Sequence, residues 1–219
     1  MGKEINLLEK YPKSKRNVED RNFNKSKKNI EIARRFDKEF FDGSRETGYG
    51  GYHYNPRFWT EVVKTFKNYW DLNDYSKLLD VGCGKGFMIY DFIKLIPGIT
   101  IKGIDISEYA INNSLEEVKN DLIVANAKSL PFEKNQFDYA ISVNTVHNLE
   151  INDCTKALKE IDRVSKRGSF VTVDAYRTEE EKERMLKWNL TAKTIMSVDE
   201  WKSYFKEINF KGDYYWFIP

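Results

Sequence analysis

The chain has 219 residues, of which 41% are hydrophobic and 32% charged, a balance typical of one compact domain with a substantial core. A net charge of +2 argues against nucleic-acid binding through bulk electrostatics, so we expect no nucleic acid partner. No apolar run approaches the ~18 residues that span a membrane, and the polar N-terminus lacks a signal-peptide pattern. Two cysteines, Cys83 and Cys154, cannot form a disulfide framework. These features predict a cytoplasmic protein with reduced thiols and no membrane partner.

The N-terminal part of the chain is polar and locally basic. Eight lysines and arginines lie between Lys10 and Lys28, against only two acids, Glu19 and Asp20. Such a run is typical of a solvated, partly disordered arm, and we interpret it in this way. The alternative is a mobile segment that attracts an anionic substrate.

A helix and a flexible loop are predicted next. Apolar residues recur at helical spacing from Ile32 to Phe41, before a loop that begins at Asp42. Three glycines stand among aromatic side chains in that loop, which predicts a pliable segment able to close over a ligand. A second helix follows from about Pro56 to Trp70.

The sequence pattern changes after residues 1–73, which we expect to form a cap or lid within the same domain. Residues 74–219 alternate short apolar runs with amphipathic helices, the pattern of a parallel sheet covered on both faces. The predicted strands are Lys77–Val81, Thr100–Ile106, Leu122–Ala125, Phe137–Val143, Ser169–Asp174 and Asp213–Ile218. A helix ending at Gly168 precedes the fifth strand. A helix over Glu179–Trp188 and another opened by the capping box Ser197–Glu200 follow it.

A glycine-rich turn joins the first predicted strand to its helix. Gly82, Gly84 and Gly86 let the backbone turn tightly and let a ligand lie against it. The dinucleotide-binding pattern G-x-G-x-x-G requires its third glycine where this chain has Phe87. Asp80, two residues before the turn, can instead hold the ammonium group of a methionine moiety. This arrangement resembles motif I of the class I S-adenosylmethionine (SAM)-dependent methyltransferases.

Three later segments extend the resemblance to that family. Asp105 ends the second strand close to 20 residues after the turn, where an acid can accept hydrogen bonds from ribose hydroxyls, a feature that fits NAD equally well. Asn126 follows the third strand, and the resemblance implies that it binds the adenine amino group. Ser142–Leu149 resembles the segment that lines the methionine side of the family's cofactor cleft. All four motifs occur in the family's order between residues 77 and 150.

The resemblance implies an α/β, Rossmann-like class I methyltransferase fold, with a mostly parallel sheet of six to seven strands and helices on both faces. The family usually adds a seventh, antiparallel strand, which an upstream segment such as Thr191–Met196 has to supply unless the sheet is trimmed. SAM is the implied cofactor and S-adenosylhomocysteine the product. The expected cofactor-binding residues are Asp80, Gly82, Cys83, Gly84, Gly86, Asp105, Ile106, Asn126, Ala127 and Asn144. No residue cluster has metal-ligand spacing, so no metal is expected.

Three side chains are candidates for catalysis. The sulfonium of SAM is already an activated leaving group, so methyl transfer needs a general base only when the acceptor is a hydroxyl or a protonated amine. His147 follows the fourth strand, where ligands bind in open α/β sheets, and serves either as the base or as a bystander. His53 in the aromatic loop is the competing base, and Asp174 is a candidate for orienting the acceptor. The side chains expected in the lid or around the acceptor are Tyr49, Tyr52, His53, Tyr54, Asn144, His147, Asp174 and Tyr176.

A small-molecule acceptor is expected, because the sequence shows neither a recognition domain nor a contiguous basic face. One hypothesis is a hydroxyl of a phosphorylated, carboxylated or sugar-type metabolite in surface-polysaccharide tailoring. The alternatives are an RNA or protein methyltransferase that docks through the basic arm, a nicotinamide dehydrogenase, and a non-catalytic SAM-fold binding subunit. We expect a monomer or a homodimer.

Overall fold

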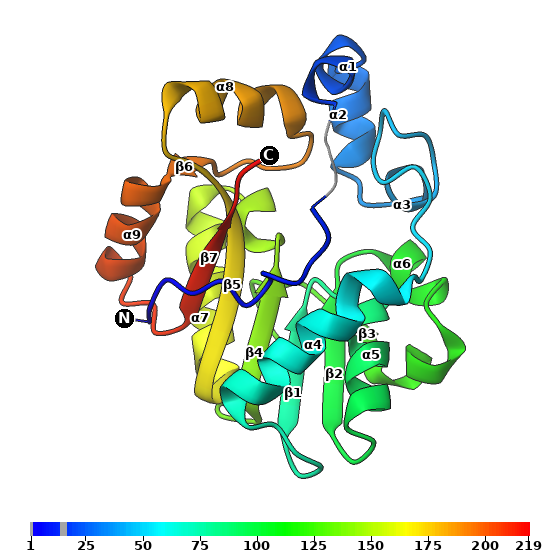
Figure 1. Ribbon diagram of the computed structural model, residues 1–219, viewed down its shortest axis with the longest axis vertical. Helices are drawn as coiled ribbons and strands as arrows, with labels where there is room; N and C mark the ends of the chain where they lie inside the picture. The colour runs from blue at the N-terminus through cyan, green and yellow to red at the C-terminus, as the bar shows by residue number, and fades with distance from the viewer. Residues whose placement is uncertain (1, 14–16) are drawn as a thin grey trace.

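The computed structural model describes residues 2–13 and 17–219, and its centre is a seven-stranded sheet (Figure 1). The strands are β1 (Lys77–Val81), β2 (Thr100–Asp105), β3 (Leu122–Val124), β4 (Phe137–Val143), β5 (Ser165–Tyr176), β6 (Met196–Ser197) and β7 (Asp213–Phe217). Their order is β3-β2-β1-β4-β5-β6, and β7 also pairs with β5. This arrangement confirms the predicted Rossmann-like methyltransferase fold.

Every strand pair in the described ranges is parallel, so these strands do not include the antiparallel strand that the family usually has. Of the candidate segment Thr191–Met196 only Met196 joins the sheet, in β6. The parallel pairing results from the path of the chain after β5. β6 pairs with the carboxyl end of β5 in parallel orientation. The helix that follows β6 then leads the chain back toward the amino end of β5, and β7 begins opposite Phe170 (Figure 1). Such a crossover produces a parallel strand, whereas a tight hairpin would have produced an antiparallel one.

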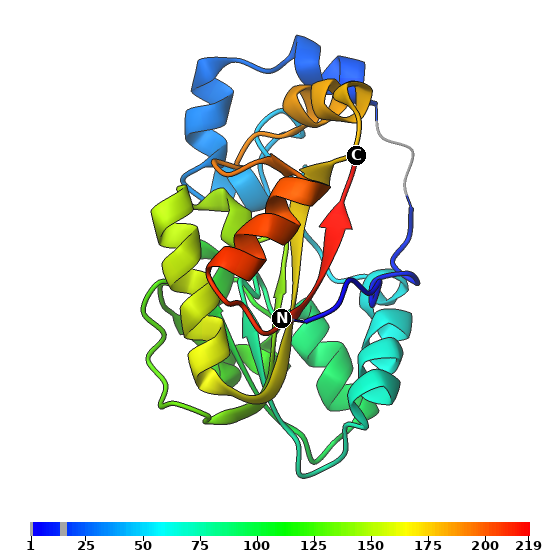
Figure 2. The ribbon, with the colours of Figure 1, turned by 90° about the vertical axis from the view of Figure 1, so that its left-hand side faces the viewer.

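Helices cover both faces of the sheet (Figure 2), as strands with near-continuous apolar runs require. One face carries α4 (Pro56–Trp70) and α5 (Phe87–Leu95), the other carries α7 (Ile151–Val164) and α9 (Val198–Glu207), and short helices α6 (Glu108–Asn112), η1 (Glu116–Asp121) and η2 (Val146–Asn148) lie in connections. Each face has its own apolar core, with Phe92 fully buried in the first and Trp201 in the second. None of the helices in the described part of the chain combines the length and apolar character of a membrane span.

A cap of four helices lies beyond the carboxyl ends of the strands (Figure 1). These helices are α1 (Val18–Phe23), α2 (Lys27–Ala33), α3 (Lys38–Phe41) and α8 (Glu179–Trp188). Glu19 of α1 pairs with Lys187 of α8 at 2.9 Å, and Lys25 donates a hydrogen bond to the Leu186 carbonyl. From residue 17 onward the predicted arm thus forms helices that contact α8, although most of its residues up to Lys28 are exposed, and residues 14–16 of the arm lie outside the described ranges.

Two predicted helix boundaries are wrong for local reasons. The apolar periodicity from Ile32 to Phe41 predicts one helix, but Phe36 adopts a φ of 52° and separates α2 from α3. The Asp37 side chain then accepts a hydrogen bond from the Lys38 N–H and caps the new helix. Gly168 does not end α7, because that helix stops earlier and the glycine lies within β5.

Candidate functional site

The glycine turn connects the carboxyl end of β1 to α5. Gly82, Gly84 and Gly86 adopt φ values of 87°, 55° and 76°, which residues with a Cβ rarely adopt. A Cβ on Gly82 would overlap the side chain of Thr145, which follows β4. The Gly82 N–H also donates to the Ile104 carbonyl of β2 at 2.7 Å. The backbone of this turn is thus held as a cradle at the carboxyl edge of the sheet.

Two buried carboxyl groups lie beside the turn, with Asp80 3% and Asp105 9% exposed. Asp105 accepts hydrogen bonds from the Gly84 N–H at 2.8 Å and the Ser107 N–H at 2.9 Å. Burial, and then the negative charge of Asp105, raises the pKa of Asp80 to about 8. In the part of the chain that the structure describes, no cation acts on Asp80. This environment favours a ligand that brings a positive charge to the turn.

The predicted adenine side lies at the carboxyl ends of β2 and β3. Ile106, directly after Asp105, is 53% exposed and offers an apolar surface there. The Asn126 side-chain oxygen accepts from the Lys128 N–H at 3.0 Å and keeps a second lone pair for an amino group. Ala127, the next residue, is buried. The structure thus brings these residues to the same edge of the sheet as the turn.

His147 lies in the short helix after β4, and its surroundings favour a structural role over the base role. The side chain is buried, its Nδ1 accepts from the Asp174 N–H at 3.2 Å, and its Nε2 lies 3.4 Å from Asp174 Oδ2. Burial lowers the pKa of His147 to about 3, so the ring is neutral near pH 7. Because both ring nitrogens face Asp174, neither is directed at an acceptor.

Three other residues predicted on the acceptor side also contact neighbouring side chains of the protein. Asn144, at a φ of 51°, accepts from the Thr172 hydroxyl at 2.9 Å. Asp174 is buried and accepts from the Asn189 amide. The Tyr176 hydroxyl lies 3.4 Å from a carboxylate oxygen of Glu200 on α9. These side chains at the end of β5 are therefore hydrogen-bonded within the protein, and their role in binding an acceptor stays a prediction.

The aromatic loop, in contrast, lies directly over the turn. The Tyr52 ring is 3.3 Å from the position of a Cβ on Gly84, and it stacks on Phe87 with ring centroids 4.8 Å apart. Tyr49 packs on Tyr52 at 4.5 Å. Tyr54 instead donates to Asp91 of α5 at 2.7 Å, and the neighbouring His53 is exposed. Tyr49 and Tyr52 thus occupy the position that a lid over the cofactor requires.

A buried ion pair that the sequence interpretation missed fastens this loop to the turn. Lys85 of the turn contacts Asp42 at 2.6 Å and also donates to the Tyr52 carbonyl at 3.0 Å. The Tyr109 hydroxyl donates to the same carboxylate at 2.7 Å. Burial alone would raise the pKa of Asp42, but the hydrogen bond from Lys85, with further donors, lowers it to about 2. Lys85 is visible in the glycine turn, whereas no sequence pattern points to its distant partner.

The structure combines a glycine turn, a pair of buried acids and a parallel sheet. This combination is typical of nucleoside-binding proteins of the class I methyltransferase type. Residues 79–173 match a family described as "Methyltransferase domain". This match covers somewhat less than half of the chain, and together with the fold it supports an assignment to the class I SAM-dependent methyltransferases, with SAM as the cofactor. The acidic pair fits it, because SAM carries a positive charge on its ammonium group and another on its sulfonium.

Similar proteins include a tRNA (carboxymethyluridine(34)-5-O)-methyltransferase of Arabidopsis thaliana, 36% identical over 128 residues, which are 58% of this chain and 30% of that protein. The mitochondrial arginine-hydroxylase NDUFAF5 of Mus musculus is 38% identical over 100 residues, 45% of this chain and 28% of that protein. The matched segment thus spans about a third of these relatives. Among solved structures, a phosphoethanolamine N-methyltransferase 2 of Haemonchus contortus shares the fold with a TM-score of 0.61 at 20% identity, covering 80% of this chain and 44% of that one.

Proposed function

We propose that the protein is an enzyme that transfers the methyl group of SAM to a small-molecule acceptor. The observation that carries this proposal is the buried pair Asp80 and Asp105 beside the glycine turn. Asp80 lies beside the backbone on which a dinucleotide would place its pyrophosphate, and a carboxyl group there fits the ammonium group of SAM better than a phosphate. Asp105 fits the ribose of either ligand. The position of Asp80 therefore disfavours the dehydrogenase alternative.

Specific residues have roles in the proposed reaction. Asp80 holds the ammonium group, Asp105 accepts from the ribose hydroxyls, and Asn126 meets the adenine amino group. SAM, when bound, supplies an already activated methyl group. The Tyr49 and Tyr52 rings exclude water from the turn, and the protein contributes mainly proximity and orientation.

The expected acceptor is a phosphorylated, carboxylated or sugar-type metabolite, with surface-polysaccharide tailoring as one setting. The cap supports a small acceptor, since its helices lie beyond the carboxyl ends of the strands, where an acceptor would approach the turn (Figure 1). The cytoplasmic location and the monomeric or homodimeric state stay predictions.

An RNA acceptor is the second candidate function. The similar Arabidopsis protein is named for a tRNA substrate, so the expectation that nucleic acid is not a partner has no support from the comparisons. Several basic residues of the N-terminal segment, such as Lys27 and Lys28, are exposed. An RNA acceptor predicts turnover that falls steeply between low and moderate salt, whereas a small acceptor predicts a shallow dependence.

Calorimetric titration with SAM, S-adenosylhomocysteine, NAD and NADP tests the cofactor. We expect binding of the first two only, and an absence of SAM binding at millimolar concentration would overturn the proposal. A screen of acceptors for S-adenosylhomocysteine release then tests the reaction. SAM binding without turnover on any acceptor class would favour the non-catalytic subunit, or a different reaction such as the hydroxylation named for the NDUFAF5 relative.

A further inference from the structure

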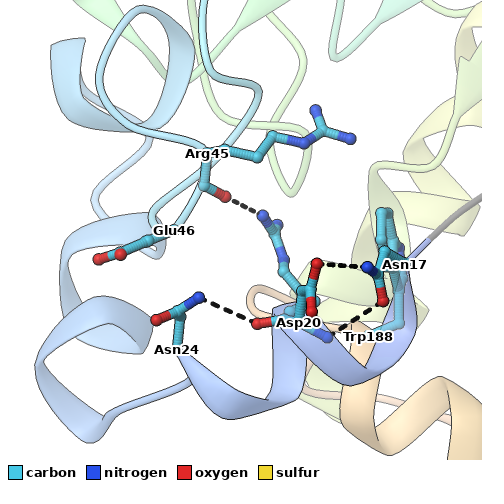
Figure 3. A pocket seen from close by; sticks show the side chains of 7 residues that line it. Asn17, Asp20, Asn24, Arg45, Glu46 and Trp188 are labelled. Atoms are coloured by element: carbon cyan, nitrogen blue, oxygen red, sulfur yellow. Dashed lines mark hydrogen bonds between the residues drawn. The ribbon is translucent and has the colours of Figure 1, made fainter.

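A hollow of about 310 Å³ lies between the cap helix α1, the aromatic loop and the end of α8 (Figure 3). The residues that line it are Asn17, Asp20, Arg21, Asn24, Arg45, Glu46 and Trp188. Most of them are polar or charged, which is unusual for a space that packing alone would close. It belongs to the cap, outside the segment of residues 79–173 that matches the methyltransferase domain family.

Two guanidinium groups are held at this hollow by backbone carbonyls. Arg21 donates to the carbonyls of Arg45 and Gly48, the latter at 3.2 Å, and its guanidinium lies 5.2 Å from the centre of the Trp188 ring. Arg45 donates to the Tyr49 carbonyl at 2.8 Å. The Nε of Arg21 is buried and has no hydrogen-bond partner. The two side chains are thus positioned, and a donor group of Arg21 is left unsatisfied.

No carboxylate of a described residue pairs with these two arginines. Asp20 accepts instead from the Asn17 amide, and Glu46 points away from the Arg45 guanidinium (Figure 3). Burial, and then the charge of Arg45, lowers the pKa of Arg21 to about 10. The pKa of nearby Lys25 is also lowered, by burial and by the charge of Arg21. Asp20 and Glu46 line the same hollow, but neither is paired with Arg21 or Arg45, so an anion that reaches both guanidinium groups would be stabilised by them.

The hollow is connected to the cofactor turn through two aromatic rings. Arg45 holds the backbone of Tyr49, Tyr49 packs on Tyr52, and the Tyr52 ring lies over Gly84. A molecule anchored in the hollow therefore has the cofactor turn on the other side of these rings.

We propose that this hollow binds the anionic group, a phosphate or a carboxylate, of the acceptor, with Arg21 and Arg45 as its anchors. The proposal rests on the proposed methyl transfer and deepens it by naming the chemical class of the acceptor. The planar guanidinium fork matches the two oxygens of either anion, and a hollow of this size admits such a group with part of the molecule that carries it. The acceptor is therefore an anionic metabolite.

Inorganic phosphate and, separately, acetate are the probes for this site. Melting temperature is measured against probe concentration at constant ionic strength, because an anion that binds the folded state raises it by mass action. We expect the Arg45→Gln variant to bind the preferred anion about tenfold more weakly or worse, and Arg45→Lys, which keeps the charge but loses the planar fork, to bind with an affinity between that of Arg45→Gln and that of the wild type. A stronger effect of phosphate points to a phosphate ester as acceptor, and a stronger effect of acetate points to a carboxylate.

The matched control is Arg167→Gln. Arg167 also lies 5.2 Å from the centre of an aromatic ring, that of Tyr139, but it lines a different basic hollow together with Lys3 and Lys211. Loss of anion binding in Arg167→Gln and not in Arg45→Gln would overturn the proposal, and so would the absence of any stabilisation by either anion. SAM titration of the same variants separates the two proposals, since anion binding without SAM binding refutes only the methyltransferase function.

Discussion

The residues of the glycine turn lie close together in the sequence, whereas those of the cap above it come from distant segments. The turn and Asp80 are almost consecutive, and Asp105, which bonds Gly84, lies 21 residues away. The cap instead brings Arg21 and Arg45 against Trp188 of α8. The family match covers the turn and omits both cap segments. We infer that the turn binds the cofactor, which is common to the family, and that the cap selects the acceptor, which differs among its members.

A single methyl group in the turn is expected to have the largest effect. Gly82→Ala would strain a positive-φ position and overlap Thr145, for a combined loss of about 2–5 kcal/mol in folding stability. SAM affinity should fall about 100-fold or more, since the displaced backbone forms the cradle. Calorimetry and thermal unfolding measure both quantities. Gly168→Ala is the control, because its Cβ would lie 3.8 Å from Tyr139, and equal damage in the two variants would contradict this account.

Removal of one charge from the acidic pair should have the next largest effect. Asp80→Asn deletes the carboxylate assigned to the ammonium group of SAM, and we expect about 10-fold to 100-fold weaker binding. Calorimetric titration measures this change. A wild-type affinity in the variant would show that the ammonium group is held elsewhere.

The same variant has a defined pH signature without cofactor. The pKa of Asp80 rises from 3.8 to about 8 on folding, so between these values the folded state holds a proton that the unfolded chain releases. Wild-type stability should therefore decline, relative to Asp80→Asn, as the pH rises from about 4 to about 8. Urea unfolding at several pH values measures the difference, and a constant difference would be inconsistent with the buried carboxyl.

A moderate effect is expected where the two regions meet. Lys85→Met leaves the half-buried Asp42 without its cation. Such a loss costs about 3–5 kcal/mol when the pair is fully buried, and we expect less here because Asp42 is partly exposed. Hydrogen exchange of residues 42–54 should accelerate, while SAM affinity changes less than in the turn variants. Lys102→Met is the control, because its pair with Asp121 is about a third exposed. If exchange in the loop stays slow, the ion pair does not hold the cap.

The sequence predicted local features well and contacts between distant segments poorly. β1, β4 and α8 have the predicted bounds, because apolar periodicity and caps act over a few residues. The turn and Asp105 were recognisable for the same reason. No local sequence pattern predicts the Lys85–Asp42 pair or the arginines near Trp188, because these residues are far apart in the sequence and meet only in the folded protein. His147 was the instructive case: its place after β4 was predicted, but its burial against Asp174 was not.

The smallest effect on turnover is expected at His147, although sequence reasoning ranked it as a candidate base. A general base contributes about 10²–10⁴-fold, so a catalytic His147 would make His147→Gln nearly inactive. We expect turnover per folded molecule to fall by far less, because both ring nitrogens face Asp174. Folding stability should change instead. The pKa of His147 falls from 6.5 to about 3 on folding, so wild-type stability is lost as the pH falls below about 6.5, and the variant lacks this contribution. A 100-fold drop in turnover with unchanged stability at acid pH would show that His147 is the base. The acceptor would then bind at the end of β5, and the cap would no longer be the acceptor side.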